Sequence, residues 1–160
     1  KQLDNQYKTL QKQIHPDHFT RKSHTERDFS AGYSAQINEA YSTLKDPLLR
    51  SKYLLKLHGV EFGNEKDTIS DPELLSQVMD VREAIENART QEALRALRQQ
   101  NEAELRKTVS SVSDAFRQMT SLPKASEQYR NALTRVETDV LKLTYLQTIN
   151  QELVSRLQAG

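Results

Sequence analysis

Three consecutive residues, His15-Pro16-Asp17, place an imidazole, a rigid proline ring and a carboxylate side by side. Imidazoles and carboxylates are the groups that most often transfer protons in enzyme sites. A residue before proline avoids the α conformation, so a helix that approaches this segment ends at His15. Taken alone, the tripeptide therefore fits an ordinary polar turn after a helix as well as it fits a site.

A metal site is the second chemistry that these residues suggest. His15 and His18 are three residues apart, but no third and fourth ligand follow at a usable spacing. The sequence has no cysteine, which excludes a disulfide framework, a cysteine-ligated metal and a cysteine nucleophile. It also lacks a glycine-rich phosphate loop and a nucleophile elbow. We predict a protein that is not an enzyme and that needs neither a metal nor a cofactor.

Helical periodicity begins at the first residues of the chain. Leu3, Tyr7, Leu10 and Ile14 form one apolar stripe of an amphipathic helix. Lys8 and Lys12, with Lys1 above them, fall on the opposite side of that helix. The first helix should end before His15-Pro16.

A second helix should follow a polar loop over residues 15–27. Thr25 and Asp28 resemble a capping box, and an apolar stripe continues from Ile37 to Leu44. Asp46 and Pro47 then predict the start of a short new helix, with Asp46 as its N-cap. Gly59 is a suitable C-terminal stop for that helix.

Residues 59–69 hold two glycines and mixed charges, which favours a linker over residues 60–69 between domains 1–59 and 70–160. Ser70 and Glu73 match a capping box, and the helix that they begin should run to about Ala88. Two longer amphipathic helices follow, separated by Pro123. The fold class is therefore all-α, a helical hairpin followed by a three-helix antiparallel bundle.

Charge divides along the chain in the same way. Residues 1–59 hold 10 Lys or Arg against 6 Asp or Glu, and residues 60–160 hold 13 against 16. This imbalance is too small to predict binding to nucleic acid. No apolar run approaches the roughly 20 residues that cross a membrane. We therefore expect protein partners, with different ones for the two parts.

The position of His15-Pro16-Asp17, between a helix with a basic outer stripe and a second amphipathic helix, resembles the J-domain family. Residues 39–53, EAYSTLKDPLLRSKY, resemble the end of the third helix of a J domain. J domains have a further short helix before the basic one, which we expect upstream of the given sequence. Residues 53–59 and 70–83 are similar to HscB, the J-type co-chaperone family of iron–sulfur cluster assembly.

The resemblance implies two partners. The first is a DnaK-type ATPase chaperone, approached by Lys8 and Lys12 and contacted by His15, Pro16 and Asp17. Asp17 would pair with an arginine of the ATPase through a charge-assisted contact. The chaperone, not this protein, would supply the ATP and the catalytic groups.

The second implied partner is the iron–sulfur cluster scaffold protein. On the helix that follows Asp71, one face carries the apolar residues of a core, and Leu75 and Met79 lie roughly 100° away from it. Packing of this pair against a neighbouring helix or the J domain is the alternative. The positions that the resemblance assigns to scaffold binding are Leu74, Leu75, Met79, Asp80, Glu83 and Leu143. Leu143 also fits the core stripe of its own helix, and Tyr145 lies close to it in the sequence.

We therefore expect a J-type co-chaperone that presents the scaffold protein to a DnaK-type chaperone and stimulates its ATPase. A J protein for another client, or a helical adaptor with an incidental His-Pro-Asp, are the alternatives. The resemblance implies the mitochondrial matrix, or alternatively the bacterial cytoplasm.

Overall fold

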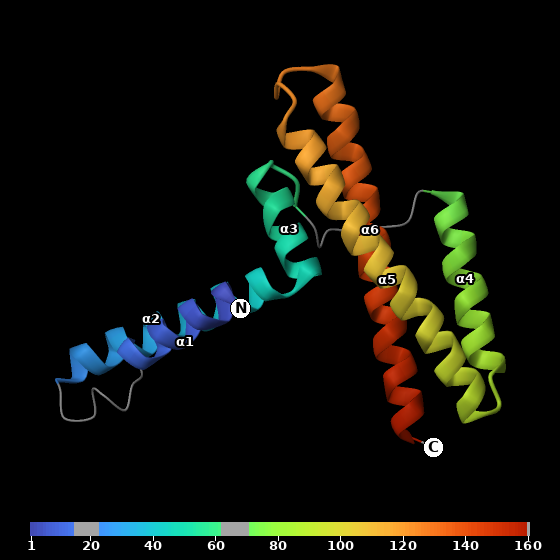
Figure 1. Ribbon diagram of the computed structural model, residues 1–160, viewed down its shortest axis with the longest axis horizontal. Helices are drawn as coiled ribbons and strands as arrows, with labels where there is room; N and C mark the ends of the chain where they lie inside the picture. The colour runs from blue at the N-terminus through green and yellow to red at the C-terminus, as the bar shows by residue number, and fades with distance from the viewer. Residues whose placement is uncertain (15–22, 62–70, 160) are drawn as a thin grey trace. The chain divides into compact units, whose positions relative to one another are not determined.

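The computed structural model describes residues 1–14, 23–61 and 71–159, and all regular structure in these residues is helical (Figure 1). The all-α prediction is confirmed. None of the helices in these ranges is long and apolar enough to cross a membrane. The described helices are α1 Gln2–Ile14, α2 His24–Lys45, α3 Pro47–Leu57, α4 Pro72–Asn87, α5 Gln91–Thr120 and α6 Glu127–Ala159.

The chain divides into two compact units, Lys1–Leu54 and Leu55–Gly160. The division falls within α3, so this helix supplies residues to both units. The boundaries predicted from sequence, 1–59 and 70–160, stay a prediction, since most of the predicted linker lies outside the described residues. Each unit is described below by itself.

The first unit is built on the hairpin of α1 and α2. The side chain of Ser23 accepts a hydrogen bond from the backbone N–H of Glu26, and Glu26 Oε2 accepts one from the backbone N–H of Ser23 at 3.0 Å. This reciprocal capping box starts α2 at His24. The prediction that Thr25 and Asp28 cap the helix was wrong, because Ser23 caps it two residues earlier and Thr25 already lies inside α2. Asp28 Oδ2 instead lies 2.7 Å from His24 Nδ1, four residues earlier on the same helix.

Hydrogen bonds, rather than apolar burial, line the contact between α1 and α2, and no residue of α1 is fully buried. We call these contacts the α1–α2 seam. Each step of three or four residues along α1 is matched by a step of three or four residues backwards along α2, as an antiparallel pair requires. The seam joins Tyr41 Oη to Asp4 Oδ1 at 2.7 Å, Tyr7 Oη to Asn38 Oδ1 at 2.8 Å, Ser34 Oγ to Gln11 Oε1 at 3.3 Å, and Ser30 Oγ to the carbonyl oxygen of Ile14 at 2.6 Å.

Two aromatic rings reinforce this seam at its middle. The rings of Tyr7 and Tyr41 stack with their centroids 3.9 Å apart and their planes inclined by 15°. Gln11 Nε2 also donates to Asn38 Oδ1, so this one amide oxygen accepts from two residues of α1. Stacking supplies apolar contact and the hydroxyls supply direction, which together fix the two helices in one register.

The ends of α3 follow the sequence prediction. Asp46 Oδ1 accepts a hydrogen bond from the N–H of Leu49 at 2.8 Å, and Pro47 is the first residue of the helix. At the other end, Gly59 adopts φ = 84°. The N–H of Gly59 bonds to the carbonyl of Lys56, and that of Val60 to the carbonyl of Leu55, which is a Schellman motif.

The second unit places α4, α5 and α6 side by side, and the long hairpin of α5 and α6 is its largest part (Figure 1). Asp71 caps α4 by accepting from the N–H groups of Glu73 and Leu74. The predicted capping box began at Ser70, which lies outside the described residues, and the observed cap is one residue later. Pro72 occupies the first turn of α4.

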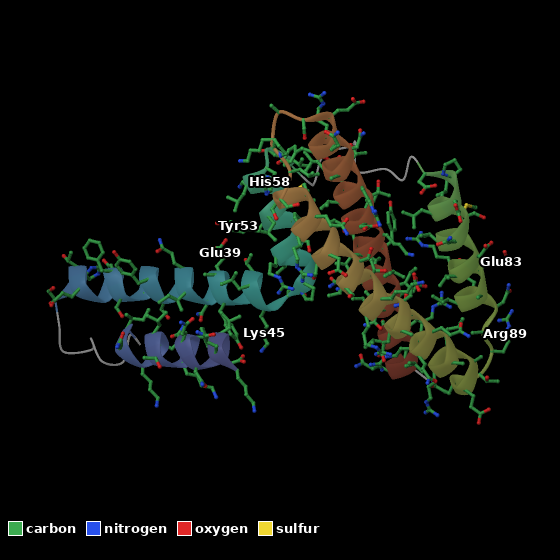
Figure 2. All side chains as sticks on the ribbon, turned by 45° about the horizontal axis from the view of Figure 1, so that its top comes forward. Glu39, Lys45, Tyr53, His58, Glu83 and Arg89 are labelled. Atoms are coloured by element: carbon green, nitrogen blue, oxygen red, sulfur yellow. The ribbon has the colours of Figure 1, made fainter. Side chains whose placement is uncertain are left out.

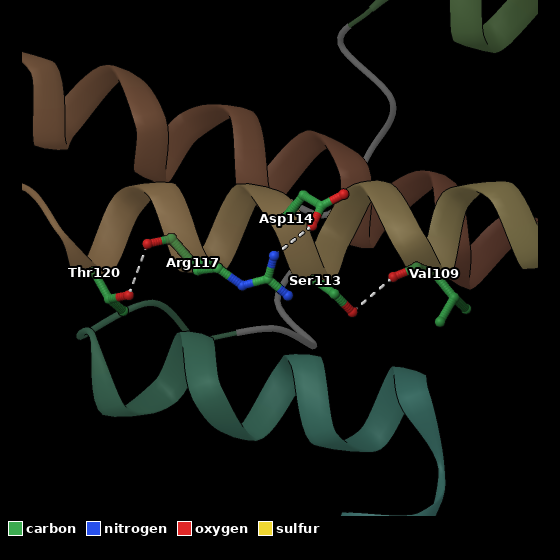
Figure 3. A network of polar contacts seen from close by, with 5 residues as sticks. All are labelled: Val109, Ser113, Asp114, Arg117 and Thr120. Carbon is green, nitrogen blue, oxygen red and sulfur yellow. Dashed lines mark hydrogen bonds and ion pairs between the residues drawn. The ribbon is translucent and has the colours of Figure 1, made fainter.

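Apolar side chains fill the core of this second unit. The fully buried ones are Leu55, Ile85, Met119, Leu143, Leu153, Val136 and Val140. Where the end of α4 meets α5 and α6, a cluster of Ile85, Leu94, Ile149 and Leu153 holds the three helices together. On α5, exposed polar side chains bond within their own helix, as the pair Arg117–Asp114 and the Ser113 and Thr120 hydroxyls do (Figure 3).

We predict opposite stability effects for alanine at two glycines. Gly59→Ala should lower the free energy of unfolding by about 1 kcal/mol, because alanine at positive φ is strained. Gly32→Ala should raise it by about 0.5–1 kcal/mol, because Gly32 lies inside α2, where alanine is the better helix former. A methyl group has free space at both positions, so the backbone alone should decide. Urea unfolding measures both, and shifts of the same sign would contradict the assigned conformations.

Candidate functional site

The tripeptide His15-Pro16-Asp17 lies outside the described residues, so the structure places only what flanks it. Ile14, the residue before it, is the last residue of α1. The backbone carbonyl of Ile14 accepts a hydrogen bond from the Ser30 hydroxyl of α2 at 2.6 Å. The chain therefore enters this segment from a fixed point of the hairpin.

The basic side of α1 is exposed as predicted. The side chains of Lys1, Lys8 and Lys12 are all on the solvent-accessible surface. Lys45 of α2 is held differently, because its ammonium group donates to Tyr41 Oη at 2.8 Å. That hydrogen bond raises the pKa of Lys45, and the Tyr41 hydroxyl lowers the pKa of Asp4 on its other side. Lys8 and Lys12 thus present the positive charge of α1 to solvent.

A surface on α4 has the composition that the sequence predicts. Leu75 is 44% exposed and Met79 is 61% exposed, and Asp80 and Glu83 are exposed beside them. We call these four residues the α4 face. Figure 2 shows Glu83 on the side of α4 that points away from α5 and α6. Within the second unit, the apolar pair does not pack against a neighbouring helix.

Two of the residues assigned to scaffold binding have little surface to offer. Leu143 is 0% exposed and Leu74 is 6% exposed, and both belong to the core of the second unit. A side chain without exposed surface cannot make the first contact with a partner. The structure thus favours the core role for Leu143, and we leave it out of the α4 face.

A cavity of about 420 Å³ lies between α4, α5 and α6 and was not foreseen from the sequence. Leu74, Val78 and Asp80 contribute to its α4 wall, and the half-buried Tyr145 lines it from α6. Asp80 thus belongs both to the α4 face and to the cavity. The aromatic residue near the α4 face is Tyr145, two positions beyond Leu143.

An ion pair at the same cavity joins α5 to α6. Lys142 Nζ lies 2.6 Å from Glu104 Oε1 and donates a hydrogen bond to it. This bond holds the pKa of Glu104 below its ordinary value of 4.5. Nearby, the buried Asn101 donates from Nδ2 to the carbonyl oxygen of Leu146 at 3.0 Å. Polar contacts therefore fix the spacing of α5 and α6 beside the cavity.

Among the described residues, no group of three or more His, Cys, Asp or Glu side chains is arranged to hold a metal ion. The clustered side chains of the α4 face are two apolar groups and two carboxylates. These groups suit contact with a protein surface that is apolar and cationic.

Residues 70–154 match the family described as the HSCB C-terminal oligomerisation domain. A co-chaperone protein HscB homolog of Burkholderia vietnamiensis is 34% identical over 151 residues, which cover 85% of this chain and 86% of the homolog. The chain belongs to the HscB co-chaperone family. The match includes all of α4, so the α4 face and the cavity both lie in the segment that defines the family.

Two human comparisons agree with this membership in the HscB family. The iron–sulfur cluster co-chaperone protein HscB of Homo sapiens is 38% identical over 116 residues, which cover 72% of this chain and 49% of the human protein. The crystal structure of human co-chaperone protein HscB superposes with a TM-score of 0.82 at 30% identity, over 96% of this chain and 72% of the human chain. The chain spans about half the length of the human and Arabidopsis thaliana relatives.

We predict a pH-dependent loss of stability for Glu104→Gln. At neutral pH the variant should unfold at lower urea concentration, because it loses the charge-assisted bond to Lys142. A carboxyl group whose pKa is lowered by folding stabilises the protein above its unfolded pKa. The difference between the two proteins should therefore shrink as the pH falls below 4.5 and Glu104 becomes protonated.

Glu137→Gln is the matched control for this prediction. Burial raises the pKa of Glu137, so its ionised form costs stability at neutral pH. The control should unfold at equal or higher urea concentration than the unmodified protein. A loss of stability for Glu104→Gln that is the same at neutral pH and at about pH 3 would contradict the assigned ion pair.

Proposed function

We propose that this HscB-family protein is a J-type co-chaperone that binds an iron–sulfur cluster scaffold protein through the α4 face. It delivers the scaffold protein to a DnaK-type chaperone and stimulates the chaperone's ATPase through His15-Pro16-Asp17. The observation that carries the proposal is the exposed α4 face in the family-matched segment. The protein itself carries out no bond chemistry in this scheme.

The chemistry of the α4 face supports a transient protein partner. Leu75 and Met79 supply apolar area that stays accessible in the second unit, and Met adapts its shape easily to a partner. Asp80 and Glu83 form a carboxylate rim that favours a partner with cations around an apolar centre. Such a face matches an interface of small area with a few dominant contacts.

Tyr145 extends this surface toward α6. It shares the cavity wall with Asp80 and Leu74, so a partner seated on the α4 face would lie near its ring. We therefore propose Tyr145, in place of Leu143, as the aromatic contribution of the last helix. Leu74 supports the surface from the core side.

The chaperone end of the proposal combines position and charge. Lys8 and Lys12 are exposed on α1, and the same helix leads directly into His15. Exposed cations speed the approach to an acidic surface, and an aspartate can pair with an arginine of the partner. We propose as the chaperone-binding set Lys8, Lys12, His15, Pro16 and Asp17. None of them is a catalytic residue in this scheme.

Two alternatives share the described geometry. A J protein for another client would keep the chaperone-binding set and use a different surface for its client. A helical adaptor would use neither. Human, plant and bacterial relatives occur among the matches, so we propose the mitochondrial matrix, with the bacterial cytoplasm as the alternative.

The double substitution Leu75→Ala/Met79→Ala should weaken binding to the scaffold protein by tenfold or more, which is about 1.4 kcal/mol. The variant loses apolar area at the centre of the proposed interface and keeps its buried core. Isothermal titration calorimetry measures the affinity, and circular dichroism checks the helix content.

Leu57→Ala is the control, because Leu57 of α3 is 61% exposed, as much as Met79, but does not belong to the α4 face. It should bind the scaffold protein with unchanged affinity. If the control weakens binding as much as the double variant does, the α4 face is not the site. No binding by the unmodified protein would remove the scaffold as the client.

Asp17→Asn should abolish stimulation of the chaperone's ATPase at a protein concentration that saturates the unmodified co-chaperone. The amide keeps the shape of the side chain and removes the charge that pairs with an arginine. A steady-state phosphate-release assay measures the effect. Binding to the scaffold protein should stay unchanged. Full stimulation of the ATPase by the variant would contradict the J-protein function and favour the helical adaptor.

A further inference from the structure

Arg156 joins two helices of the second unit through its guanidinium group. Its Nη1 donates a hydrogen bond to the backbone carbonyl oxygen of Ile85 on α4 at 3.1 Å. Its Nη2 lies 3.1 Å from Glu152 Oε1, four residues earlier on α6, so the carboxylate orients the group that reaches α4. Among the described residues, this is the one hydrogen bond that links α4 to another helix.

The acceptor of this bond is a carbonyl at the C-terminal end of α4. Ile85 is one of the last four residues of the helix, whose carbonyls lack the regular intrahelical donor. The N–H of Ala88 reaches the same oxygen only at 3.4 Å. The last turn of α4, all of which is described, contains no basic residue. Arg156 therefore supplies from α6 both the donor and the positive charge that favour the C-terminal end of a helix.

The bond also reports the register of α4 along α6. It joins residues that are 71 positions apart. The same offset relates Leu74 of α4 to Tyr145 of α6, and these two side chains line one cavity. A constant offset means that the two helices run in the same direction, as Figure 1 shows. One register therefore accounts for the bond at the end of α4 and for the place of Tyr145 beside its beginning.

Apolar contacts alone would set this register less sharply. Ile85 is fully buried in the cluster that joins the three helices, but apolar burial has no preferred direction. Toward the beginning of α4, Leu74 and Val78 border the cavity, so packing against α6 is incomplete there. A hydrogen bond, in contrast, weakens steeply when its atoms are displaced. The contact of Arg156 is thus the directional constraint between α4 and α6.

We propose that Arg156 is a positioning residue for scaffold binding, acting through the carbonyl of Ile85. Its bond sets the register in which the α4 face stands beside Tyr145. This inference rests on the proposed function. Arg156 does not contact the scaffold protein in this scheme. A partner that touches both helices binds more tightly when their register is already set, because less freedom is lost on binding.

The test compares Arg156→Ala with Arg98→Ala. Arg98 lies 2.9 Å from Glu102, so each arginine pairs with a glutamate four residues away on its own helix. The two side chains are also matched in exposure, at 41% for Arg156 and 43% for Arg98. Only Arg156 bonds to a second helix. The pair of variants therefore separates the loss of a surface ion pair from the loss of the bond to α4.

Two readouts are needed. In calorimetric titration with the scaffold protein, Arg156→Ala should weaken binding by about fivefold, which corresponds to about 1 kcal/mol. Arg98→Ala should weaken it by less than twofold. In amide NMR spectra of the free protein, Arg156→Ala should shift the Leu75 and Met79 resonances, roughly two to three turns before Ile85. Arg98→Ala should leave these resonances in place, and circular dichroism checks that both variants keep their helices.

The outcomes separate this inference from the proposed function. Equal losses of affinity in the two variants, or no loss in Arg156→Ala, would overturn the inference. Weaker binding by Arg156→Ala with unshifted Leu75 and Met79 resonances would mean that the guanidinium group contacts the partner directly, and would also overturn it. If the unmodified protein does not bind the scaffold protein, the proposed function fails, and the NMR comparison still decides whether Arg156 sets the register of α4.

Discussion

Directional hydrogen bonds between α1 and α2 are the constraint on which the first unit depends. A helix with no fully buried side chain gains little from the hydrophobic effect, so its position has to be set by other contacts. A single hydrogen bond contributes only about 1 kcal/mol net, but it tolerates little displacement. The seam therefore specifies the register of the hairpin more than it adds to stability.

The second unit relies on apolar burial rather than hydrogen bonding to hold its helices together. Its long α5–α6 hairpin buries a continuous apolar core, and a few polar contacts, such as Lys142–Glu104, only fix spacing. Because the core is supplied by other residues, α4 can turn Leu75 and Met79 outward at little cost in stability. A binding surface of this kind needs a rigid support, and the apolar core provides it.

Periodicity predicted the helices well, because one apolar stripe per helix is a strong signal. It also placed Leu75 and Met79 off the core face of α4. Caps were less certain: Ser23 and Asp71 took the places expected of Thr25 and Ser70, since several neighbouring residues can satisfy the same orphan donors. A hydropathy pattern does not distinguish Gln11 and Asn38 from other polar surface residues. The α1–α2 seam therefore could not be predicted from that pattern. The cavity beside Tyr145 depends on how three helices pack, which no single stripe encodes.

Asn38 has a consequence for how this sequence can change over evolutionary time. Its amide oxygen accepts from Tyr7 and Gln11 together, so a substitution that removes this oxygen removes two contacts of the seam at once. The fit of this position thus depends on two residues of the facing helix as well as on its own side chain. We expect Asn38, Tyr7 and Gln11 to covary as a triplet among related hairpins, although neither the burial nor the chemistry of Asn38 marks it as special.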